Sequence, residues 1–140
     1  MKYSYTTVDK RKLYDIPHAD LIKMLDMAKK AMKHCYPVKN EGFSVSVLTD
    51  KGNIYTGASY KSDTATLTMH SEAVALTHAA QHGETNIIAI TGPNCHICKQ
   101  LIWESSLKSN IEIQIIIEEN GLINKIPISS LMPYPWPERE

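Results

Sequence analysis

The chain has 140 residues, of which 43% are hydrophobic, enough apolar side chain for one compact core. Its 15 basic and 15 acidic residues cancel to a formal net charge of zero, so the charge balance does not favour a nucleic-acid backbone or an anionic membrane as a partner. We find neither an apolar signal-peptide core in residues 1–17 nor an apolar run of membrane-spanning length. We therefore expect a single cytoplasmic domain over residues 1–140, with an N-terminal arm at 1–17 and a proline-rich tail at 133–140.

Hydrophobic spacing predicts the elements of the first half of the chain. Residues 18–33 carry apolar side chains at helical spacing with lysines on the other side, which predicts an amphipathic helix. Alternation at 43–48 predicts a strand, which a turn joins to a second strand at 54–57 as a hairpin. Residues 68–82 have helical composition and are followed by Gly83, a residue typical of helix C-termini.

Strands and helices alternate in the second half. The nearly all-apolar run 86–91 predicts a strand buried on both faces, and 95–108 predicts a helix. The β-branched run 111–117 predicts a strand parallel to 86–91, because the segment between them is helical and long enough for a right-handed crossover. An edge strand is expected at 122–126. This order of elements predicts an α/β fold, in which a mixed sheet has helices on both faces.

Three residues have the character of a catalytic zinc site. Zinc prefers a tetrahedral shell of imidazole and thiolate groups, and a catalytic site keeps one position for water. Cys95 and Cys98 are three residues apart at the start of a predicted helix, where both sulfurs can face one point and the free N–H groups favour thiolates. His70 lies near the start of the other predicted helix and supplies a third ligand. The alternatives are a structural zinc site or three unrelated residues.

Glu72, two residues after His70, is the candidate proton shuttle. Bound zinc lowers the pKa of water from about 15.7 towards roughly 7, but a second group must still move the protons. A carboxylate beside that water can accept its proton, deliver it to a ring nitrogen and later protonate a departing amine. We therefore expect Glu72 to be catalytic rather than a ligand, although a glutamate in isolation is usually a solvated acid at a helix start.

These residues resemble the motifs of the cytidine deaminase family. The zinc deaminase signature is H-x-E followed by P-C-x-x-C. His70-Ser71-Glu72 and Cys95-His96-Ile97-Cys98 match it, with Asn94 where the proline usually precedes the first cysteine. Cys98-Lys99-Gln100 is similar to the family's Cys-Arg-Gln run, and 43–57 resembles its first hairpin.

The resemblance spans about residues 28–103 and implies a cytidine deaminase-like three-layer α-β-α sandwich with a mixed five-stranded sheet. It implies one catalytic Zn²⁺ on His70, Cys95 and Cys98, with Glu72 as the catalytic residue. The implied enzyme is a zinc hydrolase that acts on a cyclic amidine and converts a cytosine-like nucleoside to its uracil-like product with release of ammonia. A homo-oligomer, either a homotetramer or a homodimer, is also implied.

The positions that contact the sugar in the family differ in this chain. In the family's nucleoside deaminases, an Asn and a Glu after the hairpin glycine hold the ribose hydroxyls, and the matching positions here are Ser59 and Lys61. A lysine adds a donor in place of an acceptor, which better suits a phosphate, a carboxylate or another polar substituent. A specialised aminopyrimidine or nucleotide deaminase of the blasticidin type is therefore an open alternative. Both residues can equally be surface residues at the exit of the hairpin.

Phe43 is the third candidate for substrate binding, since its ring can border a base, and the alternative for a strand aromatic is the core. The competing function is a non-catalytic ligand-binding module on the same fold, which has no need of Glu72. A polynucleotide editor ranks lower, because it requires a basic groove with aromatic platforms. We expect a small nucleoside-like substrate, with no membrane or nucleic-acid partner.

Overall fold

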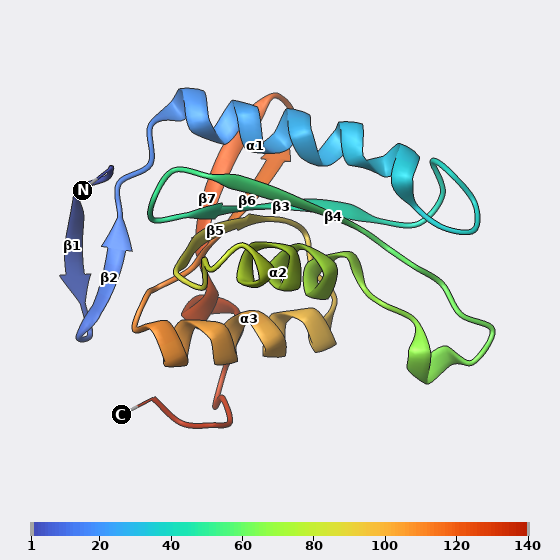
Figure 1. Cartoon of the computed structure of the whole chain (residues 1–140). Helices are drawn as coiled ribbons and strands as arrows, with labels where there is room; N and C mark the ends of the chain where they lie inside the picture. Colours follow the sequence, from blue (N-terminus) through green and yellow to red (C-terminus); the bar gives the residue numbers. More distant parts are fainter. Residues whose placement is uncertain (1, 140) are drawn as a thin grey trace.

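The computed structural model describes residues 2–139, and within them a five-stranded sheet lies between two layers of helices (Figure 1). The strands are β3 (Ser44–Thr49), β4 (Ile54–Ala58), β5 (Ile87–Thr91), β6 (Gln114–Glu119) and β7 (Leu122–Pro127). Their order in the sheet is β4-β3-β5-β6-β7. β5 and β6 run parallel, whereas the other neighbouring pairs are antiparallel. The predicted mixed sheet and its parallel crossover are therefore confirmed.

Helices cover both faces of this sheet. α1 (His18–Ala31) lies on one face, and α2 (Ser71–Gln81) and α3 (His96–Ser109) lie on the other (Figure 1). α1 ends two residues earlier than predicted, and a 3-10 turn at Met32–His34 follows it. The expected three-layer α-β-α arrangement is confirmed. No helix in the described part of the chain is long and apolar enough to cross a membrane.

β5 forms the centre of the core. All five of its residues are buried, as expected for a strand with helices over both faces. Its neighbour β6 begins at Gln114 rather than at Ile111 as predicted. Ile111 is instead bridged to Lys12, and the backbone N–H of Glu112 donates to the carbonyl of Lys12 at 2.8 Å. The segment before β6 therefore pairs with the N-terminal arm instead of with β5.

The N-terminal arm folds as a separate hairpin of β1 (Tyr5–Val8) and β2 (Arg11–Tyr14), which hydrophobic spacing does not predict. Arg11 is 2% exposed, and its guanidinium lies 4.6 Å from the centre of the Trp103 ring on α3. The indole N–H of Trp103 also donates to the carbonyl of Pro137 at 2.9 Å. The arm and the proline-rich tail thus both pack on α3.

α2 and β4 approach each other closely at Gly57. A Cβ atom at Gly57 would lie 2.3 Å from the carbonyl oxygen of Ser71 and 2.4 Å from the backbone nitrogen of Ala75. Such separations are far inside van der Waals contact, so only glycine allows this approach. The first turn of α2, which begins at Ser71, is thereby held against the hairpin.

Glu84 links the hairpin to the loop after α2. The carboxylate is buried and accepts hydrogen bonds from Thr49 Oγ1 at 2.6 Å, from Asn53 Nδ2 at 2.8 Å and from the Tyr55 hydroxyl. The hydrogen bonds from Thr49, Tyr55 and Asn53 hold the pKa of the Glu84 carboxyl below its ordinary value of 4.5. The ionised form of Glu84 therefore stabilises the folded state.

We expect Glu84→Gln to lower the thermal unfolding midpoint at neutral pH and to flatten its pH dependence. Because the pKa of Glu84 is lower in the folded state than its ordinary value of 4.5, its contribution is present above that pH and is lost as the pH falls through the lower folded value. Unfolding followed by circular dichroism from about pH 7 to about pH 3 measures this effect. Glu119→Gln, at an exposed carboxylate, is the control. A difference from wild type that is the same at every pH would contradict the prediction.

Candidate functional site

The predicted metal ligands lie where α2 and α3 begin. His70 directly precedes α2 and Cys95 directly precedes α3, both with extended backbone, and Cys98 lies in the first turn of α3. The helix predicted over 68–82 begins three residues later than expected, because Thr68 to His70 precede the first helical residue, Ser71. Neither of these two described helix starts has a side-chain cap. The positive ends of two helix dipoles therefore lie next to the three side chains.

The geometry of the three side chains fits a zinc ion. Their ligand atoms all lie within 4.8 Å of one another. His70 Nδ1 lies 3.5 Å from Cys95 Sγ and 3.3 Å from Cys98 Sγ. Bonds of about 2.3 Å to sulfur and about 2.0 Å to nitrogen in a tetrahedron place such atoms about 3.5 Å apart. Nδ1 of His70 is therefore the nitrogen that would bind the ion together with the two cysteine sulfurs.

The charges around Cys98 also favour a bound cation. Burial raises the pKa of the Cys98 thiol above its ordinary value, and the negative charge of nearby Glu72 raises that pKa further. A divalent ion reverses this effect, because it binds the thiolate and replaces the thiol proton. Two thiolates and one neutral imidazole would then balance the charge of Zn²⁺.

Glu72 lies in the first turn of α2 and is 6% exposed. Both of its carboxylate oxygens accept hydrogen bonds. Ser71 Oγ donates to Oε1 at 2.9 Å, and Asn94 Nδ2 donates to Oε2 at 2.8 Å. The carboxylate therefore lies beside the metal-ligand group in a fixed orientation, and Asn94 is a contact that the motif alone did not predict.

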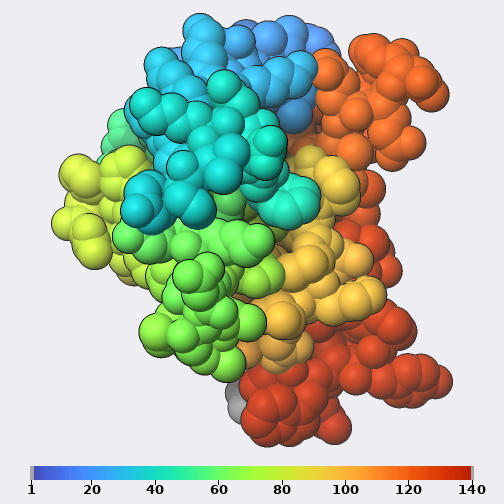
Figure 2. Space-filling model, turned by 90° about the vertical axis from the view of Figure 1, so that its right-hand side faces the viewer, coloured from blue at the N-terminus to red at the C-terminus, as the bar shows by residue number. Residues whose placement is uncertain are grey.

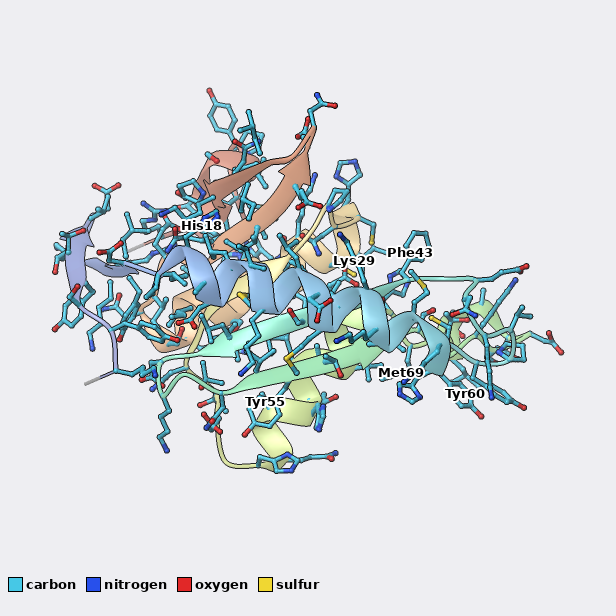
Figure 3. The ribbon with its side chains drawn as sticks, turned by 90° about the horizontal axis from the view of Figure 1, so that it is seen from above. His18, Lys29, Phe43, Tyr55, Tyr60 and Met69 are labelled. Atoms are coloured by element: carbon cyan, nitrogen blue, oxygen red, sulfur yellow. The ribbon has the colours of Figure 1, made fainter. Side chains whose placement is uncertain are left out.

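A cavity of about 590 Å³ brings the predicted site residues together. Those that line it are His70, Glu72, Cys95, Phe43, Ser59 and Lys61, while Cys98 is buried beside them. Phe43 is 74% exposed, so the alternative that it belongs to the core is wrong. Phe43 directly precedes β3, and its ring lies at the rim of the cavity. Figure 3 shows it near the end of the hairpin.

Ser59 is partly committed to the shape of this rim. Its hydroxyl accepts a hydrogen bond from the backbone N–H of Phe43 at 3.1 Å and lies 3.7 Å from the Cys35 sulfur. A Cβ atom at Gly42 would lie 2.5 Å from that hydroxyl, and Gly42 has a φ of +105°. Glycine is therefore required at this turn, and Ser59 holds the turn in place.

Two loops, one through Tyr36 and one through Tyr60, complete the cavity, and the sequence did not predict their contact with each other. The rings of Tyr36 and Tyr60 stack with centres 4.7 Å apart, and the backbone of Tyr60 pairs with that of Met69. These loops, cyan and green in Figure 2, lie on one face next to the start of α3. Glu41 and Asp63 also line the cavity. In the sequence, the one signal for this cavity wall is the presence of Tyr36 and Tyr60 in segments that are otherwise mostly polar.

We expect the purified protein to hold one zinc ion per chain, and His70→Ala or Cys98→Ser to lose it. Removing a ligand should weaken zinc binding by more than the roughly 10- to 100-fold that loss of an outer hydrogen-bond partner causes. Zinc content by mass spectrometry, with a competing chelator, measures the affinity. His96→Ala is the matched control, since His96 is outside the ligand group among the described residues. Full zinc retention in His70→Ala would contradict the assignment.

Solved structures of cytidine deaminases share this fold. The enzyme from Mycobacterium tuberculosis matches with a TM-score of 0.67 at 18% identity, over 87% of this chain and 98% of that chain. The one from Burkholderia pseudomallei matches with a TM-score of 0.66 at 19% identity, over 86% of this chain and 100% of that chain. At such identities the likeness shows the fold alone. No curated protein matches the sequence.

A family model gives the stronger assignment. The model described as the cytidine and deoxycytidylate deaminase zinc-binding region matches residues 19–112, which is more than half of the chain. The matched region contains His70, Glu72, Cys95 and Cys98. It also contains the strands and helix starts that bring these four side chains together. The chain therefore belongs to the cytidine and deoxycytidylate deaminase family.

Proposed function

We propose that the protein is a zinc-dependent hydrolytic deaminase that converts a cytosine-like nucleoside to its uracil-like product and ammonia. The observation that carries this proposal is the meeting of His70, Cys95 and Cys98 with a buried Glu72 beside one cavity. Family membership supports the reaction class. The cavity volume of about 590 Å³ is in the range typical of small-molecule sites.

Zn²⁺ is the proposed cofactor. When bound, it supplies an activated water, since it lowers the pKa of a bound water from about 15.7 towards about 7. His70 contributes Nδ1, and Cys95 and Cys98 contribute thiolates that the two helix starts stabilise. His70 and Cys95 are exposed, so a substrate can reach the site from their side, whereas Cys98 is buried.

Glu72 is the proposed proton shuttle. Its carboxylate accepts the proton of the attacking water and delivers it to the ring nitrogen of the base. It then takes the hydroxyl proton of the adduct and passes it to the departing amine, which leaves as ammonia while the ring carbonyl forms. A non-catalytic binding module has no use for a buried carboxylate at this position, so Glu72 favours the enzyme over that alternative.

We expect Glu72→Gln to keep zinc and to lower kcat by about 100- to 10,000-fold, the usual range for removal of a general acid–base group. Ammonia release would be measured on cytidine, deoxycytidine, their monophosphates, cytosine, blasticidin S and aminopurines. Zinc content and the unfolding midpoint of the variant serve as controls. Wild-type turnover in Glu72→Gln would contradict the shuttle. Silence of the zinc-loaded wild type across the panel would favour the binding module.

The substrate contacts are proposed at Phe43, Ser59 and Lys61. The exposed ring of Phe43 can stack on a base at the rim of the cavity. The ammonium of Lys61 supplies a donor on the same cavity, which suits a phosphate, a carboxylate or another polar substituent. A nucleotide or a specialised aminopyrimidine of the blasticidin type is the second candidate substrate on this ground.

We expect Lys61→Glu to shift the preference towards cytidine, because it restores the acid that family nucleoside deaminases direct at the ribose. The ratio of kcat/KM for cytidine to kcat/KM for cytidine monophosphate should rise by at least about tenfold, which is the effect expected from one charge-assisted hydrogen bond. Lys125→Glu, on the exposed edge strand β7, is the charge control. An unchanged ratio in a folded Lys61→Glu variant would exclude Lys61 from substrate recognition.

A homo-oligomer, a tetramer or a dimer, is the proposed assembly. Exposed apolar side chains line the cavity or lie on the adjoining loop at residues 59–70, and such surfaces often mark protein contacts. They include Tyr36, Val38, Phe43, Tyr60, Leu67 and Met69. A cytoplasmic location is proposed because a zinc site on Cys95 and Cys98 needs reduced cysteines and because Cys35 forms no disulfide among the described residues. Residues 1–140 are proposed to form one domain, since the arm and the tail both pack on α3.

A further inference from the structure

We propose that Asn94 is a positioning residue, which holds the carboxylate of Glu72 in the orientation that proton transfer needs. Asn94 lies between β5 and α3 and is 8% exposed. Its Nδ2 donates to Glu72 Oε2 at 2.8 Å. The role given to Glu72 rests on the proposed deaminase function, whereas the contact between the two side chains does not.

The hydrogen bonds of Asn94 fix which way its amide points. Nδ2 donates both to Glu72 Oε2 and, at 3.1 Å, to the carbonyl oxygen of Thr91. An amide nitrogen carries two hydrogens, so each acceptor receives one. The flipped amide would place Oδ1 against two other acceptors and lose both bonds. Asn94 therefore bridges the end of β5 and the carboxylate of Glu72.

This arrangement has a cost in stability. Asn94 Oδ1 is buried and has no hydrogen-bond partner among the described residues. A Cβ atom at Gly92 would lie 2.8 Å from Oδ1 and 2.6 Å from Ile115 Cγ2, so glycine at this position makes room for the side chain. A buried acceptor without a partner destabilises the fold. Local conflicts of this kind are expected at functional positions rather than at purely structural ones.

Asn94 differs from Ser71 in what it connects. Ser71 precedes Glu72 in the sequence, so its bond to Oε1 stays within the start of α2. Asn94 comes from a segment 22 residues away and directly precedes Cys95, a proposed zinc ligand. Its bond to Oε2 therefore fixes the carboxylate relative to the metal centre. The proline that usually occupies this position has no side-chain donor, so this chain gains a link that the usual motif lacks.

The test is Asn94→Leu in the full-length, zinc-loaded protein, since leucine has a similar size but no donor and no charge. We expect kcat to fall about 10- to 100-fold, because a small misplacement of a catalytic group has effects of this size. KM should stay within about threefold, since Asn94 does not line the cavity. Zinc should remain stoichiometric. A crystal structure of the variant should show the Glu72 carboxylate in a different rotamer.

Two further variants keep the outcome interpretable. Asn94→Ser leaves space instead of an apolar group and is too short to reach Glu72, so it should lose kcat in the same way even where leucine disturbs folding. Asn124→Leu, on the exposed edge strand β7, controls for the exchange of an amide for leucine.

Wild-type kcat in either folded Asn94 variant would overturn the proposal, and so would a rise in KM alone. An unmoved Glu72 carboxylate in the crystal structure of Asn94→Leu would overturn it as well. Failure of the wild type to release ammonia from any substrate would count against the deaminase function instead, and the crystal structure would still decide whether Asn94 positions Glu72.

Discussion

The approach of α2 to the hairpin at Gly57 is the contact on which the site depends. A side chain at this position would collide with the backbone of Ser71, which lies between His70 and Glu72. The same contact therefore sets the position of His70, the proposed metal ligand, and that of Glu72, the proposed proton shuttle. The thiols reach the site from the other side, because β5 leads directly into the start of α3. Two strand-to-helix connections thus build one centre, a short one from β5 to α3 over residues 92–95 and a longer one from β4 to α2 over residues 59–70.

Charge explains why these groups occur together. The site concentrates two thiols and a carboxylate, and the raised pKa of Cys98 reflects burial and the negative charge of Glu72. The helix starts supply positive potential, but a divalent ion supplies far more. The negative charges of the two thiolates and of the Glu72 carboxylate therefore favour the same bound cation. Asn94 and Ser71 keep that carboxylate oriented.

The proposed catalytic groups and the proposed substrate contacts lie in different parts of the molecule. The proposed metal ligands and Glu72 lie at helix starts packed on the sheet, whereas the walls of the cavity come from loops around Tyr36 and Tyr60 (Figures 2 and 3). Loops tolerate change while the scaffold keeps its geometry. The departures from the family motif at Ser59 and Lys61 fall on the loop side, which is the side expected to differ between deaminases of different substrates.

The sequence by itself determined the helices, the central strands and the three candidate ligands His70, Cys95 and Cys98, because periodicity and short spacing report which side chains share a face or a helix turn. It did not determine the pairing of Lys12 with Ile111, which displaced the start of β6, or the exposure of Phe43. Nor did it reveal the bond from Asn94 to Glu72. Only the tertiary structure decided these, because contacts between distant segments leave no periodic signal in the chain.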